Sequence, residues 1–112
     1  MEVGEGSVDA LTVIEVKGRV DSTTAPALGE RLTGALAAPR KRVIVDLSGA
    51  DYLSSAGLRV LLRAPEQADR TDGKLVLHGL NSRVREVFEI SGFVGILTIC
   101  STRDEALVAA AA

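Results

Sequence analysis

Residues 43–62 read VIVDLSGADYLSSAGLRVLL, and this stretch decides the fold because its apolar spacing changes from strand-like to helix-like. Residues 43–47 form a short apolar run between basic residues and a Ser-Gly pair, which is typical of a strand covered on both faces. A short loop is expected to follow. A helix is then expected from about Ser55, with Ser54 or Ser55 at or beside its N-cap. Its apolar positions are Leu58, Leu61 and Leu62.

The N-terminal part of the chain shows the same alternation of spacing. Residues 10–20 are rich in β-branched side chains and predict a strand, with residues 3–8 as a candidate antiparallel partner. Residues 24–38 have helical spacing, and Pro26 fits the first turn of that helix. Four successive residues are N-cap candidates for it, namely Asp21, Ser22, Thr23 and Thr24.

The C-terminal part continues the pattern. Pro65 interrupts the second helix, so it either kinks that helix or starts a new segment. Thr102 and Glu105 have the spacing of a capping box. The expected elements are a turn at 71–73, a strand at 75–78, a helix capped by Asn81 or Ser82 and stopped by Ser91-Gly92, a strand at 95–100 and a helix that begins after Thr102.

Strands that alternate with helices predict an α/β fold, in which helices cover a mostly parallel sheet. We expect four to five strands and about four helices. The 112 residues fit one domain, with a core over about residues 8–108. The alanine-rich C-terminal end, Ala109 to Ala112, is expected to fray.

The scarce residues exclude several classes of protein. One histidine and one cysteine cannot form a disulfide framework or the usual zinc site. A net charge of -2 and few aromatic residues argue against direct nucleic-acid binding. No apolar run is long enough to insert into a membrane, and the first ten residues do not resemble a secretory signal. We therefore expect a cytoplasmic domain with no metal and no cofactor.

Enzyme motifs are not found in the sequence. There is no phosphate-binding P-loop and no Gly-x-Ser-x-Gly nucleophile elbow. His78 at the end of a predicted strand could serve a serine hydrolase or transferase, but a structural role is the commoner one for a lone histidine. Cys100 ends a predicted apolar strand and is expected to act as a small buried hydrophobe. The chain is expected not to be an enzyme.

The serine pair at the start of the second helix has two possible roles. A serine there is commonly a simple cap, whose hydroxyl accepts a hydrogen bond from a free N–H of the first turn. The same position presents a hydroxyl outward to a kinase. A phosphate would lie close to free N–H groups and to the positive end of the helix dipole, so the fold would tolerate it. Phosphorylation would then alter surface charge more than structure.

The same segment carries a family resemblance. Residues 44–48 and 52–62 resemble the signature of STAS domains, specifically that of bacterial anti-sigma factor antagonists. Further segments match in order and spacing, namely residues 18–25, 73–77 and 84–93. The resemblance covers nearly the whole chain and implies a single STAS-like domain.

The resemblance implies a switch in binding. Such a protein binds an anti-sigma factor that is also a serine/threonine kinase, and thereby frees the sigma factor. The kinase phosphorylates the antagonist, which is then released, and a serine phosphatase resets it. By its place before Ala56-Gly57-Leu58, Ser55 matches the phosphorylated serine. Ser54 stands where better-known members carry aspartate and is the second candidate acceptor.

The resemblance also implies a docking surface and leaves alternatives. The residues that it implies for partner binding are Asp21, Ser22, Thr23, Thr24, Tyr52, Leu53, Ser54, Gly57, Leu58 and Arg59. The protein itself is expected to be a monomer or weak dimer. One alternative function is a STAS scaffold subunit of a transport or signalling complex, in which Ser55 is only a cap. The other is the small enzyme that uses His78 with a serine.

Overall fold

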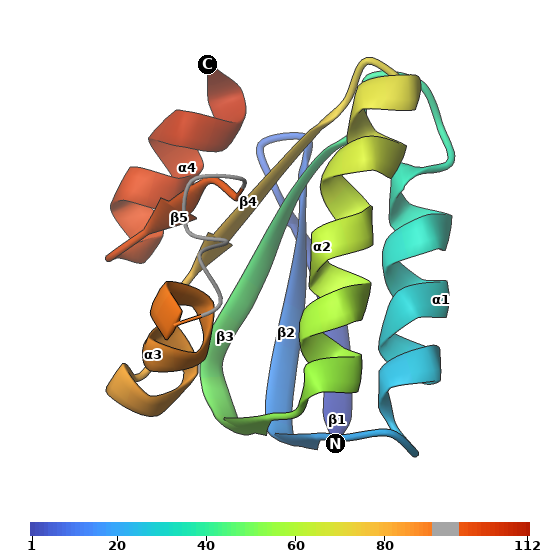
Figure 1. The fold of residues 1–112 in the computed structure, drawn as a ribbon. Coiled ribbons are helices and arrows are strands. Elements are labelled where there is room, and N and C mark those ends of the chain that lie inside the picture. The colour runs from blue at the N-terminus through green and yellow to red at the C-terminus, as the bar shows by residue number, and fades with distance from the viewer. Residues whose placement is uncertain (91–96) are drawn as a thin grey trace.

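A computed structural model describes residues 1–90 and 97–112 of the chain (Figure 1). Strands and helices alternate along it after an initial pair of strands, as the sequence predicts. The elements are β1 (Glu2–Val8), β2 (Leu11–Val20), α1 (Ala25–Leu36), β3 (Arg42–Leu53), α2 (Ser55–Arg70), β4 (Lys74–His78), α3 (Ser82–Ile90), β5 (Ile99–Cys100) and α4 (Arg103–Ala111).

The sheet follows the order of the chain. Within the described residues it has five strands in the order β1-β2-β3-β4-β5. β1 pairs with β2 antiparallel, whereas β2, β3, β4 and β5 are parallel to one another. The predicted α/β class and the mostly parallel sheet with an antiparallel edge are confirmed.

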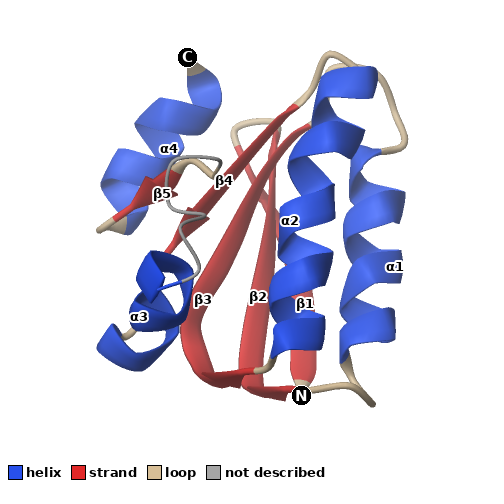
Figure 2. Ribbon diagram, in the orientation of Figure 1, coloured by secondary structure: helices blue, strands red, loops and turns tan. Residues whose placement is uncertain are grey.

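Both faces of the sheet are covered (Figure 2). Val43 and Val45 belong to the larger core cluster, which includes buried residues of α1, α2 and α3. Ile44, between them, belongs to a second cluster with Ala106 and Ala110 of α4. Successive side chains of a strand point to opposite faces, so this alternation places α4 alone on its face among the described helices. The expectation of a strand buried on both sides is confirmed.

The third strand is longer than predicted. We expected it to end at residue 47, with a loop after it, but β3 runs to Leu53. Its second half pairs with the end of β2, with register shifts on either side of Lys17. Gly49 allows this pairing, because a Cβ there would lie 2.8 Å from the Lys17 side chain and 3.3 Å from the Val16 carbonyl oxygen. The long strand carries the chain directly to the start of α2.

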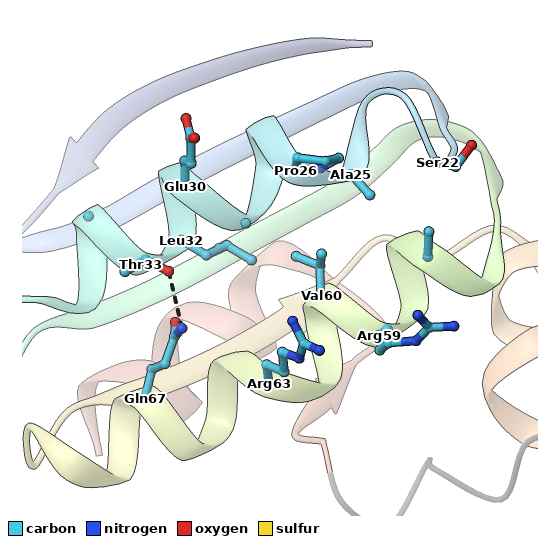
Figure 3. Close-up of a pocket in the computed structure, with 13 residues that line it drawn as sticks. Ser22, Ala25, Pro26, Glu30, Leu32, Thr33, Arg59, Val60, Arg63 and Gln67 are labelled. Atoms are coloured by element: carbon cyan, nitrogen blue, oxygen red, sulfur yellow. Dashed lines mark hydrogen bonds between the residues drawn. The ribbon is translucent and has the colours of Figure 1, made fainter.

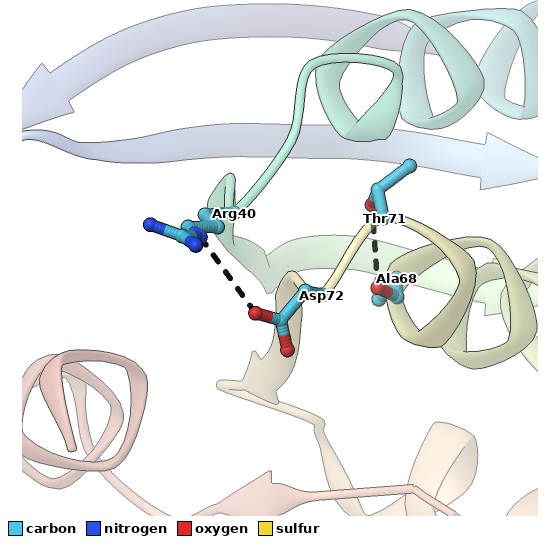
Figure 4. A network of polar contacts seen from close by, with 4 residues as sticks. All are labelled: Arg40, Ala68, Thr71 and Asp72. Carbon is cyan, nitrogen blue, oxygen red and sulfur yellow. Dashed lines mark hydrogen bonds and ion pairs between the residues drawn. The ribbon is translucent and has the colours of Figure 1, made fainter.

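The second helix is continuous through Pro65, which settles the question that the sequence left open. The expected turn closes it: the N–H of Gly73 donates to the Ala68 carbonyl at 2.7 Å, and Asp72 has a positive φ of 58°. Arg40, which precedes β3, joins this turn by donating its N–H to the Thr71 carbonyl at 2.8 Å. Its side chain forms an exposed pair with Asp72 (Figure 4).

The third helix is capped by Asn81, one of the two N-cap candidates predicted from the sequence. The Asn81 side chain accepts a hydrogen bond from the Val84 N–H at 2.8 Å, and Val84 and Phe88 are buried while Val87 is half-buried. The predicted strand at 95–100 is too long, because only Ile99–Cys100 pair with β4 among its described residues. Residues 95–96 and the expected Ser91-Gly92 stop lie outside the described residues.

The C-terminal helix has hydrogen bonds at both of its ends. Thr102 accepts from the Glu105 N–H at 3.2 Å, and the Glu105 carboxylate reaches back to the Ser101 N–H at 3.3 Å. The helix runs to Ala111, Ala110 is buried against the sheet, and Arg42 donates to the carbonyl groups of Ala110 and Ala112 at 2.6 Å each. No helix in the described part of the chain is long and apolar enough to cross a membrane.

Candidate functional site

The candidate site lies where the carboxyl ends of β2 and β3 meet the starts of α1 and α2. The two strands end side by side, with Val20 opposite Leu53. The N–H of Ser54 then donates to the Val20 carbonyl at 2.8 Å, which extends this pairing by one more bond. The starts of α1 and α2 therefore lie together at the carboxyl ends of the strands. Open α/β sheets generally bind their ligands at this end.

The two serines at the start of α2 have different environments. Ser54 is the N-cap, with extended backbone (φ -81°, ψ 172°), and its Oγ accepts a hydrogen bond from the Gly57 N–H at 3.3 Å. Its side chain is half-buried. Ser55 is the first residue of the helix and is exposed. The structure thus separates a capping serine from an exposed serine, which the sequence alone did not.

Three of the predicted contact residues lie beneath the surface. Leu53 and Leu58 are only 5% and 6% exposed, and Gly57 is also buried. A Cβ at Gly57 would lie 2.6 Å from the Leu53 side chain and 2.7 Å from that of Val20. The side chains of Leu53 and Leu58 are therefore buried, and the close approach of Leu53 and Val20 leaves no room for a side chain at position 57.

The turn before α1 is organised by Asp21. One carboxylate oxygen of Asp21 accepts from the Thr23 N–H at 3.0 Å, the Thr23 hydroxyl at 2.7 Å and the Thr24 N–H at 3.2 Å. The bonds from Thr23 and Thr24 hold the pKa of Asp21 below its ordinary 3.8. Thr24 occupies the N-cap but makes no cap bond with its side chain. Ser22 and Thr23 are exposed, so this turn presents hydroxyl groups around a fixed carboxylate.

An aromatic and cationic patch adjoins the serines. Tyr52 is 41% exposed, and the guanidinium carbon of Arg19 lies 4.1 Å from the centre of its ring. A cavity of about 310 Å³ next to Tyr52 is lined in addition by Arg83 and Val87 of α3. No sequence motif singled out Arg19, Arg83 or Val87 as part of this site. Arg19 could have been found, because a third strand extended to residue 53 pairs Arg19 with Tyr52.

His78 does not belong to this site. It is 5% exposed and follows Val76 by two residues on β4, so it lies on the face that α4 covers, whereas α2 packs on the other face. Its Nε2 lies 3.9 Å from a carboxylate oxygen of Asp46, and no hydrogen-bond partner for this nitrogen is found in the described residues. The sheet separates His78 from Ser54 and Ser55, so His78 does not lie beside either serine of this site.

The pKa of Asp46 determines how this residue affects the stability of the fold at low pH. Burial raises the pKa of Asp46, but hydrogen bonds from the hydroxyl and N–H of Ser48, together with the electrostatic effect of His78 and Arg103, lower it by a larger amount, so the net pKa lies below 3.8. A lowered folded pKa stabilises the fold at pH values above the unfolded pKa. That stabilisation is lost as pH falls through the folded value.

We therefore expect the wild-type chain to lose more stability between about pH 5 and about pH 3 than Asp46→Asn does. The amide retains an oxygen acceptor for the Ser48 N–H, whose bond to Asp46 is 2.9 Å long. Urea midpoints at both pH values provide the measurement. Equal losses in the two proteins would show that Asp46 does not govern acid stability.

Comparison with known proteins identifies the family. The model of the STAS domain matches residues 5–106. The "Putative anti-sigma factor antagonist BtrV" of Bordetella bronchiseptica is 38% identical over 97% of this chain and 94% of its own. An anti-sigma-B factor antagonist of Listeria monocytogenes is 30% identical over 94% and 91%.

Solved structures agree with this result. The crystal structure of an anti-sigma factor antagonist from Mycobacterium paratuberculosis has a TM-score of 0.83 and 26% identity, and the match covers 99% of this chain and 94% of that one. Family model, sequence relatives and fold all point the same way. The chain belongs to the STAS domain family, among its anti-sigma factor antagonists.

Proposed function

We propose that this chain binds an anti-sigma factor in its unphosphorylated form, thereby frees a sigma factor, and is released when Ser55 is phosphorylated. The anti-sigma factor would itself be the serine kinase, and a separate serine phosphatase would restore the binding form. In this scheme the chain is a substrate and a binding partner, not an enzyme, and it works in the cytoplasm.

The observation that carries the proposal is the difference between the two serines. Ser55 is exposed, whereas the Oγ of Ser54 is engaged with the Gly57 N–H. A kinase that modified Ser54 would have to break the cap of α2, which is worth about 1 kcal/mol. Modification of Ser55 breaks no hydrogen bond described at the cap. It adds a charge of about -1.5 to -2 to the surface.

The surroundings of Ser55 suit a protein interface. The exposed residues at the ends of β2 and β3 and at the starts of α1 and α2 combine hydroxyl, aromatic and cationic groups, namely Ser22, Thr23, Tyr52, Arg19 and Arg59. Tyrosine and arginine are enriched among the residues that contribute most to protein interfaces. A phosphate at Ser55 would bring a strongly hydrated dianion into this surface, and a closely fitting partner would have to desolvate it. Release follows without a change of fold.

The test uses a kinase-type anti-sigma factor that binds the chain in a pull-down. After incubation with ATP and Mg²⁺, we expect intact mass spectrometry to show one added phosphate, and fragmentation to place it on Ser55. A phosphate on another residue, or none, would refute the proposal. The scaffold alternative predicts a stable complex and no phosphate.

A further inference from the structure

A groove runs between α1 and α2 on their outer side, with a volume of about 760 Å³ (Figure 3). Its floor is formed mainly by small and apolar residues. The helices approach closely there, since a Cβ at Gly29 would lie 3.6 Å from both methyl groups of Val60. At one end, the Gln67 amide donates to the Thr33 hydroxyl at 3.1 Å. The other end includes Ala56, the neighbour of Ser55 in the chain.

The rim of the groove is basic. Arg59 and Arg63 of α2 line it, against the single carboxylate of Glu30 from α1. Both arginines are exposed, and neither forms an ion pair within residues 1–90 and 97–112. The chain as a whole carries a net charge of -2, so this local excess of positive charge runs against the overall balance. An apolar floor under two free guanidinium groups favours an acidic segment that also carries apolar side chains.

Arg59 connects this groove to the serine switch. It lies four residues after Ser55 on the same helix, and both side chains are exposed. Residues four apart on a helix are neighbours on its surface, and a guanidinium forms strong hydrogen bonds with phosphate. A phosphate on Ser55 therefore lies within reach of a residue that lines the groove.

Building on the proposed function, we propose that the groove binds an acidic segment of the anti-sigma factor, and that a phosphate on Ser55 competes with that segment for Arg59. Phosphorylation then acts twice. It places charge at the docking surface, and it withdraws one of the two arginines from the groove. Arg63 lies outside the docking surface that the family resemblance implies, so it tests the groove separately from the switch.

The binding experiment compares two charge reversals by calorimetry against the purified anti-sigma factor that binds the wild-type chain. Arg63→Glu should weaken binding at least about tenfold, because it opposes an acidic segment. Lys41→Glu is the matched control. It changes the net charge equally, but Lys41 is exposed in the segment before β3 and does not line the groove. It should stay within about twofold of wild type. Arg63→Glu at wild-type affinity, or equal weakening by both variants, would overturn the groove as a docking site.

The competition is measured on the chain alone, with phosphoserine incorporated at position 55. Titration followed by ³¹P NMR should give a phosphate pKa about half a unit higher in Arg59→Gln than in the wild-type chain, since the guanidinium favours the dianion. Arg63→Gln should change it by less than about 0.2 units, because Arg63 is two turns away. An unchanged pKa in Arg59→Gln would refute the competition.

The two proposals fail in different ways. If phosphorylated and unphosphorylated chains bind the anti-sigma factor equally, the switch is wrong, whatever Arg63→Glu does. If phosphorylation releases the partner but Arg63→Glu binds like wild type, the switch stands and the groove is wrong.

Discussion

Replacing Ser55 by alanine should abolish phosphorylation by the anti-sigma kinase and leave the free energy of unfolding within about 0.5 kcal/mol of wild type. The Ser55 side chain is exposed and does not cap α2. Its loss therefore removes the hydroxyl that accepts the phosphate without removing a contact that stabilises the helix. Intact mass spectrometry measures the first effect and urea denaturation the second. If Ser55→Ala is still phosphorylated to the wild-type level, the kinase modifies a residue other than Ser55.

Ser54→Ala is the matched control and should behave in the opposite way. It removes the Oγ that accepts from the Gly57 N–H, so the free energy of unfolding should fall by about 1 kcal/mol. The phosphate on Ser55 should still be added. The reverse result, a stable Ser54→Ala that is no longer phosphorylated, would exchange the roles of the two serines.

Gly57→Ala should destabilise the fold by about 2 kcal/mol, because it overfills the contact beneath the helix start. The new methyl group would lie 2.6 Å from the Leu53 side chain and 2.7 Å from Val20, and the β-branched Val20 has little rotamer freedom to give way. Since Leu53 directly precedes the serine cap, binding to the anti-sigma factor should weaken as well. Chemical denaturation and calorimetry provide the two measurements.

Gly34→Ala is the control for the general effect of alanine in a helix. Gly34 lies within α1, and a Cβ there meets nothing within 4 Å. The substitution should therefore stabilise the fold by about 0.5–1 kcal/mol. A loss of stability in Gly34→Ala, or a gain in Gly57→Ala, would contradict the packing described under α2.

Local pattern was sufficient for much of the fold. The β-branched run of β2, the helical leucines of α2 and the capping box of α4 are each signals within a few neighbouring residues, and each predicted its element. The extension of β3 to Leu53 was missed because Ser48-Gly49 looks locally like a break. What keeps the strand going is pairing with β2, whose residues lie some thirty positions earlier, and the close approach that Gly49 permits.

The candidate site was likewise predicted only in part from the sequence. The resemblance predicted phosphorylation at Ser55, with Ser54 as the second candidate, and the cap geometry adds a physical difference between the two serines. Leu53 and Leu58 were included among the contact residues through the family resemblance, which gives positions but does not show that these two side chains are buried. Arg63 was not singled out, since the groove depends on how α1 and α2 pack together.

The central claim is that one phosphate on Ser55 switches binding. Its most direct test is calorimetric titration of one purified anti-sigma factor with the unphosphorylated chain and with the chain that carries phosphoserine at position 55, both shown to be folded. We predict a dissociation constant at least about 30-fold larger for the phosphorylated chain. Equal dissociation constants for the two forms would contradict the account.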